Sequence, residues 1–245
     1  MPAHPVVNPA TLPVPTEPAT PRVTLRLSAS LMLAGQLLYI VITQLHAGGD
    51  ANDHHTVFAG YAGSEIWGVV HVGQFAGMAI FLAGLFALPF AQRNPAGTAG
   101  LAGRFGAAAA VATLAMYGLL QAVDGVALKQ AVNAWVSAPD AEQAARFATA
   151  EAIRWLEWGV RSYQNLALGL ALLLVAAAIA RAPRIPRPIA PLMGLAGLAY
   201  LVQGWLVGAT GFSAAESIAI VAAFVLDLVW MSWLLVAAFR RGRTH

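Results

Sequence analysis

The chain has 245 residues, of which 59% are hydrophobic and only 10% are charged, whereas about 25% of the residues of an ordinary soluble domain are charged. So few charges could not cover the surface of a soluble protein, and the mean hydropathy of +0.67 points the same way. The net charge of +3 does not indicate nucleic acid binding, because the basic residues stand at the ends of apolar runs. The absence of cysteine excludes disulfides, thiolate metal sites and thiol catalysis.

The chain begins with a proline-rich segment. Residues 1–21 hold seven of the 14 prolines and no aromatic residue. Such a composition cannot form a packed core. The segment is no signal peptide, because no basic start precedes a short apolar core. We therefore predict a disordered cytoplasmic tail over residues 1–22.

Apolar runs of about 20 residues, each long enough to cross the hydrocarbon core of a bilayer, fill most of the remaining chain. Between the third and fourth runs, residues 129–152 are more polar. They predict an extension of the third helix, a break at Ser137 to Pro139, and a short interfacial helix. The fold class is thus all-α, an integral membrane bundle of six transmembrane helices over residues 23–241. The predicted spans are about 25–45, 66–90, 105–128, 153–180, 189–208 and 217–239.

The basic residues predict how the bundle is oriented. With six spans, ten of the 14 Lys and Arg residues fall on one side of the membrane, and lysine and arginine collect on the cytoplasmic side. Both termini are therefore expected in the cytoplasm, and a bacterial cytoplasmic membrane suits the lack of cysteine. The ten are Arg22, Arg26, Arg93, Arg104, Arg181, Arg184, Arg187, Arg240, Arg241 and Arg243.

A charged stripe opens the fourth span. Arg154, Glu157, Arg161 and Gln164 are spaced 3, 4 and 3 residues apart and so share one face of a helix. Charges at this depth need partners inside the bundle. We expect the partners to be polar residues in the outer half of the other spans. These are His71, Gln74, Gln121, Asp124 and Asp227.

These converging residues predict a polar pocket on the extracytoplasmic side. The leading hypothesis is binding or transport of a small molecule or ion, since guanidinium groups suit a carboxylate or phosphate. The alternative is a self-satisfied ion network in a structural or accessory subunit, because Arg154 and Arg161 face nearly balancing carboxylates.

A second alternative is a membrane-embedded metal-dependent enzyme. His46, Asp50, His54 and His71 offer imidazole and carboxylate ligands for a divalent metal such as zinc. No HExxH spacing occurs. A further hypothesis is a haem that is held by His46 and His71. No catalytic residue can be named, because the chain has neither a GxSxG elbow nor a P-loop.

One stretch resembles a known family. The run His46-Ala-Gly-Gly-Asp50 after the first span, with Trp67 to His71 opening the second, is similar to the DUF4386-like bacterial membrane proteins of unknown function. The resemblance covers mainly residues 30–90. It implies a fold of about six spans and a membrane location, with the lipid bilayer as partner. It implies no ligand, and the sequence does not indicate an oligomeric state.

Overall fold

The structure is a computed structural model that describes residues 20–92 and 97–240. The predicted tail, residues 1–22, lies outside the described residues except for its last three, which begin the first helix. All elements in the described part are helices. In chain order they are α1 (Thr20–Thr43), α2 (His54–Gly63), α3 (Trp67–Ala87), η2 (Leu88–Ala91), α4 (Gly97–Gln121), the π-helix η3 (Ala122–Leu128), α5 (Lys129–Val136), α6 (Asp140–Ile179), α7 (Ile189–Thr210) and α8 (Ala214–Arg240).

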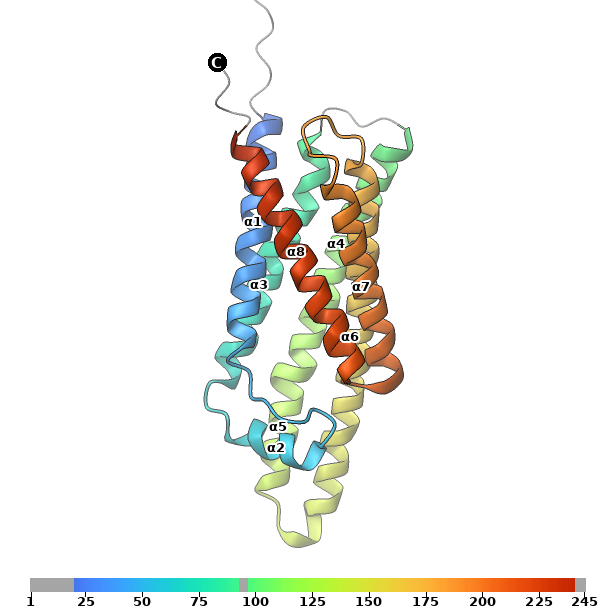
Figure 1. The fold of residues 1–245 in the computed structure, drawn as a ribbon. Coiled ribbons are helices and arrows are strands. Elements are labelled where there is room, and N and C mark those ends of the chain that lie inside the picture. The colour runs from blue at the N-terminus through green and yellow to red at the C-terminus, as the bar shows by residue number, and fades with distance from the viewer. Residues whose placement is uncertain (1–19, 93–96, 241–245) are drawn as a thin grey trace, which may run out of the picture.

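Six helices of the described chain are long and apolar enough to cross a membrane, which confirms the predicted all-α membrane bundle. They begin at the starts of α1, α3, α4, α6, α7 and α8, and each packs on the next, while α8 closes the ring against α1 (Figure 1). The outer surface is apolar, and Val69 and Ile218 are each 72% exposed. Exposed apolar side chains over so much of a surface suit contact with lipid.

The middle of the bundle is filled by side chains and closely packed helices. A Cβ added to Gly35 of α1 would lie only 2.6 Å from the carbonyl oxygen of Gly77 in α3. Two helix backbones can approach this closely only where small residues face each other. The large side chains that are fully buried in the core include Met32, Phe81, Tyr117, Leu172 and Trp230.

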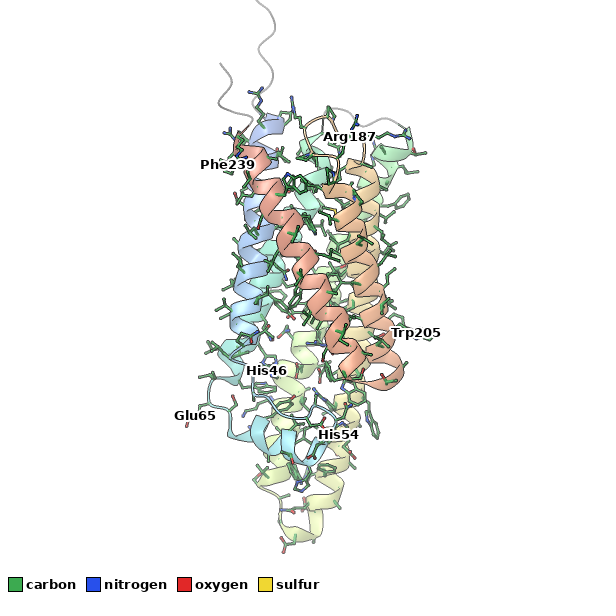
Figure 2. The ribbon with its side chains drawn as sticks, viewed as in Figure 1. His46, His54, Glu65, Arg187, Trp205 and Phe239 are labelled. Atoms are coloured by element: carbon green, nitrogen blue, oxygen red, sulfur yellow. The ribbon has the colours of Figure 1, made fainter. Side chains whose placement is uncertain are left out.

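The two ends of the bundle differ in chemistry. Arg187 and Phe239 lie at the end where α1 starts and α8 finishes, whereas His46, His54 and Glu65 lie at the opposite end (Figure 2). The first end carries the arginine-rich connection between α6 and α7. Three arginines of the orientation argument, Arg93, Arg241 and Arg243, lie outside the described residues.

The short interfacial helix predicted between the third and fourth spans is not a separate element. The chain does break at Ser137–Pro139, but α6 then runs without interruption for 40 residues, about 60 Å. Pro139 is its N-cap residue, Asp140 and Glu142 stand in its first turn, and carboxylates there favour a helix. The following alanine-rich stretch contains no helix breaker. The start of α6 and α5 therefore form a hairpin that projects beyond the other helices (Figure 1).

The helix α2 lies between the first two predicted spans, where no helix is predicted from the sequence. The carboxylate of Asp53 caps it by accepting a hydrogen bond from the Thr56 amide at 3.2 Å. Its buried residues, Val57, Phe58 and Tyr61, belong to a second small core with side chains of α5 and α6. The helix therefore lies across the end of the bundle that carries His46.

A single lysine fastens the other end of α2. Lys129 Nζ donates hydrogen bonds to the carbonyl oxygens of Tyr61, Ala62 and Ser64 at 2.6, 2.8 and 3.0 Å. The last carbonyls of a helix lack partners within it, and a cation there is stabilising. Lys129 thus ties α2 to the chain just after η3.

Candidate functional site

A polar cavity of about 280 Å³ lies at the end of the bundle covered by α2. It is termed the loop-end cavity below. The connection after α1, the helix α2, the segments η3 and α6, and Phe212 between α7 and α8 all contribute to its lining. Its titratable or charged lining residues other than Tyr61 are His46, Asp124, Arg154, Glu157 and Arg161.

The π-helix η3 shapes one wall of this cavity. Its Gly125 carbonyl accepts a hydrogen bond from the indole Nε1–H of Trp67 at 3.0 Å. A Cβ on Gly125 would lie 3.0 Å from three atoms of His71, so the glycine leaves room for that imidazole. Single turns of π-helix inside α-helices often mark functional sites. Here the π turn includes Asp124.

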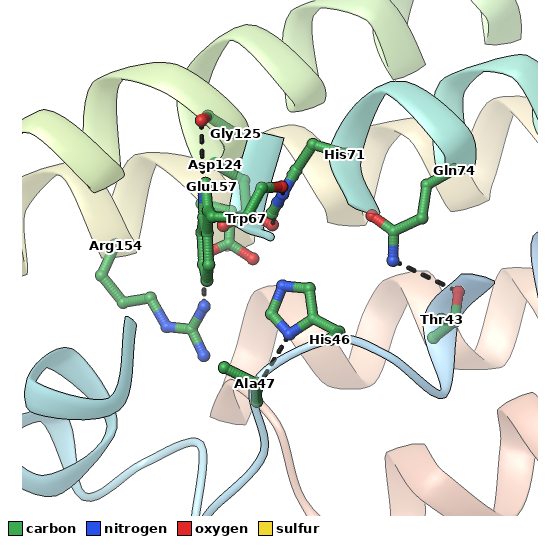
Figure 3. Close-up of polar contacts among 10 residues, drawn as sticks. All are labelled: Thr43, His46, Ala47, Trp67, His71, Gln74, Asp124, Gly125, Arg154 and Glu157. Carbon is green, nitrogen blue, oxygen red and sulfur yellow. Dashed lines mark hydrogen bonds and ion pairs between the residues drawn. The ribbon is translucent and has the colours of Figure 1, made fainter. Parts of the chain in front are cut away.

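Two histidines and an aspartate gather beside this wall, from the connection after α1, from α3 and from η3 (Figure 3). His71 Nδ1 donates to the Trp67 carbonyl at 2.9 Å, and its Nε2 lies 3.2 Å from Asp124 Oδ2. His46 Nδ1 donates to the Ala47 carbonyl at 2.9 Å. One ligand atom from each of the three residues lies within 4.8 Å of the others. His46, His71 and Asp124 are termed the His-His-Asp cluster.

Arg154 and Glu157 form an ion pair on α6. Arg154 Nη1 donates to Glu157 Oε2, and its Nη2 donates to the Ala51 carbonyl at 3.3 Å. The side chains are only 3% and 1% exposed. The Arg154 guanidinium also lies 4.8 Å from the centre of the Phe212 ring. Both terminal nitrogens of the Arg154 guanidinium are therefore used within the protein, whereas its buried Nε has no hydrogen-bond partner among the described residues.

Arg161 stands further along the same face of α6 and lacks such a partner. Among the described residues no carboxylate lies within ion-pair distance of it, and its buried Nε has no hydrogen-bond partner. Its guanidinium lies 5.2 Å from the centre of the Phe212 ring. The formal charges that line the cavity are balanced, because the two cations Arg154 and Arg161 are matched by the two carboxylates of Asp124 and Glu157.

The fold places the remaining predicted pocket residues at different points. Gln74 lines the loop-end cavity and donates to Thr43 Oγ1 at 3.2 Å. Gln121 lines a separate, mostly apolar cavity of about 400 Å³ beside His71. Gln164 is buried but lines neither of these two cavities.

Asp227 does not join the pocket. Its two carboxylate oxygens accept hydrogen bonds from Tyr200 Oη and Trp230 Nε1, each at 2.9 Å. It stands near the middle of α8, about 20 Å along the helix from Ala214. Asp227 is separated from the loop-end cavity by its depth in the bundle. The helix face on which a residue lies does not give this depth.

Two of the four predicted metal ligands also lie elsewhere. Asp50 Oδ1 accepts a hydrogen bond from the backbone amide of Asn52 at 3.1 Å in an exposed turn. His54 Nδ1 pairs with Glu151 Oε1 at 3.0 Å, and its ring stacks on Phe58. Because α2 carries His54 toward α6, only His46 and His71 of the predicted set come together.

Sequence reasoning missed two aromatic residues that line the cavity, Tyr61 and Phe212. Burial raises the pKa of Tyr61 to about 12, so its hydroxyl stays protonated. Burial also lowers the pKa of His46, which keeps that imidazole neutral near pH 7. The sequence offered no signal for Phe212, since a lone aromatic residue between two spans is ordinary.

In the part of the chain that the structure describes, a ring of six apolar helices with a polar cavity at one end defines a multi-pass membrane protein. The family model described as "Domain of unknown function (DUF4386)" matches residues 25–238. The chain therefore belongs to this family, and the resemblance seen over residues 30–90 extends over most of its length. No curated protein and no solved structure matched the chain.

Proposed function

We propose that this protein binds a small anionic molecule, one that carries a carboxylate or phosphate group, in the loop-end cavity. The observation that carries the proposal is the position of Arg161. Its guanidinium lines the cavity, and within the described chain it has no carboxylate partner.

Arg161 is half-buried, and its buried Nε has no hydrogen-bond partner among the described residues. A charged group that is withdrawn from water without a direct partner is costly. Arg154 already binds Glu157 and the Ala51 carbonyl, so the two arginines differ in what they can offer a ligand. The guanidinium of Arg161 has five N–H donors in a fixed plane, which fit the oxygens of a carboxylate or phosphate. An anion in the cavity would supply the missing partner.

The size and surroundings of the cavity support a small ligand. At about 280 Å³ it lies just below the range of about 300–1,000 Å³ for small-molecule sites. Further into the bundle, Phe81, Tyr117 and Leu172 are fully buried in a packed core. This filling supports binding at one end rather than passage through the bundle.

The ligand is proposed to enter from the extracytoplasmic side of the membrane, a bacterial cytoplasmic membrane. The basic connection at 180–188 lies at the opposite end of the bundle from His46. The connection at 46–65 contains no lysine or arginine. Lysine and arginine collect on the cytoplasmic side, which supports an extracytoplasmic location of the cavity.

The test is isothermal titration of the detergent-purified protein with inorganic phosphate, succinate and a panel of small mono- and dicarboxylates. We expect at least one of these anions to bind, and Arg161→Gln to weaken its binding about 10- to 100-fold, because one charge-assisted hydrogen-bonding group is lost. The matched control is Arg146→Gln, since Arg146 makes only an exposed pair with Glu142. Absence of binding by the whole panel, or equal affinities in the two variants, would overturn the proposal.

A further inference from the structure

We propose that His46, His71 and Asp124 bind one divalent first-row transition-metal ion of the Zn²⁺ type, with an open coordination position toward the loop-end cavity. This metal site goes beyond the anion site and does not depend on it. The anion site rests on Arg161, whereas the metal site rests on the His-His-Asp cluster.

The distances within the cluster suit a shared ion. Two ligands that each lie about 2.0–2.1 Å from a tetrahedral zinc ion are about 3.3 Å apart. His71 Nε2 and Asp124 Oδ2 are 3.2 Å apart, and the ligand atom of His46 completes a group within 4.8 Å. A small movement of the connection that carries His46 would bring all three atoms to one ion.

Both imidazoles are already oriented for a metal. Each donates its Nδ1–H to a backbone carbonyl, that of Trp67 for His71 and that of Ala47 for His46. This leaves Nε2 as the ligand atom in both rings. Metal-binding histidines almost always give their other nitrogen to such a partner, which fixes the tautomer and the ring orientation.

Two buried atoms of the cluster, His71 Nε2 and Asp124 Oδ1, have no hydrogen-bond partner among the described residues, although Nε2 lies 3.2 Å from Asp124 Oδ2. Their residues are only 4% and 5% exposed. An unsatisfied buried polar group destabilises the folded protein. Coordination to a metal ion would satisfy the imidazole nitrogen and use the carboxylate charge at the same site.

The ligand types narrow the choice of ion. Two imidazoles and one carboxylate suit Zn²⁺, Fe²⁺ and related ions, whereas Ca²⁺ and Mg²⁺ prefer oxygen ligands alone. Three protein ligands with a fourth position left open are the arrangement of reactive rather than structural zinc sites. The open position faces the cavity because His46 and Asp124 both line it.

A bound ion would also change the charge of the cavity. Asp124 and Glu157 balance Arg154 and Arg161 in the protein alone, so a divalent ion brings the sum to about +2. If the anion of the proposed function binds there, we expect it to bind more tightly to the metal-loaded protein. This last expectation rests on the proposed function, whereas the metal site does not.

The test uses the full chain, purified through a tag without histidine and stripped with a chelator. Titration with Zn²⁺ should give one ion per chain, and Co²⁺ should give the visible absorption of a low-symmetry site. His71→Ala, Asp124→Asn and His46→Gln should each weaken Zn²⁺ binding at least about 100-fold, since even changes to outer partners of metal ligands cost 10- to 100-fold. His46 stands in a connection outside the helices, so we expect His46→Gln to fold. Its Zn²⁺ affinity tests the site even if a helix variant fails to fold.

The matched control is His55→Ala, because His55 packs on the rings of Trp135 and Phe147, away from the cluster. It should bind Zn²⁺ as the wild type does. The metal site is overturned if the wild type binds no Zn²⁺, or if His46→Gln binds it as tightly as His55→Ala. Arg161→Gln should weaken anion binding and leave Zn²⁺ binding unchanged, so the two proposals can fail separately.

Discussion

His71 donates its Nδ1–H to the carbonyl of Trp67 one helical turn earlier and turns its Nε2 toward Asp124 at 3.2 Å. This contact joins α3 to the π-helix η3 at the edge of the loop-end cavity. The indole of Trp67 in turn donates to Gly125, the residue after Asp124. The imidazole is therefore held from two sides.

The fit of His71 against η3 predicts the effect of Gly125→Ala. The new methyl group would meet the His71 side chain at 3.0 Å, so that side chain must shift from its present position beside Asp124. We expect Zn²⁺ affinity to fall about 10-fold, as for other changes that disturb the orientation of a ligand. Gly118→Ala is the control, since its methyl group would meet only Phe75 at an ordinary 3.6 Å. Equal affinities in the two variants would show that Gly125 does not position His71.

The buried pair of Arg154 and Glu157 predicts a non-additive pattern of stability. Glu157→Gln leaves the Arg154 guanidinium buried without its counter-charge, and we expect the free energy of unfolding to fall by about 3–5 kcal/mol. The double variant Arg154→Met, Glu157→Leu should regain most of this loss, because it removes both charges. Unfolding in mixed detergent measures the effect. If the double variant loses as much free energy of unfolding as its two single changes together, Arg154 and Glu157 are not a coupled buried pair.

Lys129 predicts how firmly α2 covers the cavity. Lys129→Met removes three hydrogen bonds to carbonyls at the end of α2. We expect a loss of about 2 kcal/mol, in the range for hydrogen bonds of charged groups, with faster proteolysis in residues 54–66. The neighbouring Gln130→Ala is exposed and should change neither measurement. Unchanged proteolysis in Lys129→Met would mean that α2 is held in another way.

The start of α2 predicts a dependence on pH. Hydrogen bonds from Thr56, first from its side chain and then from its amide, lower the pKa of Asp53. A carboxylate with a lowered pKa stabilises the folded state above its unfolded value of about 3.9, and this contribution disappears as the pH falls through the folded value. We expect pepsin to cleave α2 faster as the pH is lowered below about 4.

The matched variant for this experiment is Asp53→Asn, which keeps an oxygen acceptor but does not titrate. In Asp53→Asn we expect the part of the faster cleavage at low pH that comes from protonation of Asp53 to disappear. If pepsin cleaves wild type and Asp53→Asn with the same pH profile, the cap of α2 does not depend on the ionisation of Asp53.

The membrane fold could be predicted because it depends on the length of apolar runs and on the positions of arginines. The helices α2 and α6 were misread for local reasons. Asp53 caps a short helix whose burial depends on Trp135 far along the chain, and the polar start of α6 masked its continuity with the fourth span.

The site could be predicted in part. The face shared by Arg154, Glu157 and Arg161 follows from helical spacing, and all three line the cavity. Grouping His46 and His71 with Asp124 required the relative depth of three elements, which spacing within one helix does not give. The same limit explains why Asp227 was placed in the pocket, although it lies beside Tyr200 and Trp230.

The central claim is that the loop-end cavity holds an anion against Arg161. An experimental density map of the protein, prepared with the tightest-binding anion of the panel, tests it most directly. We predict density for the anion in the cavity, within hydrogen-bond distance of the Arg161 guanidinium, with Arg154 still paired to Glu157. A cavity that holds only water, with Arg161 bound to Glu157 or Asp124, would contradict the claim.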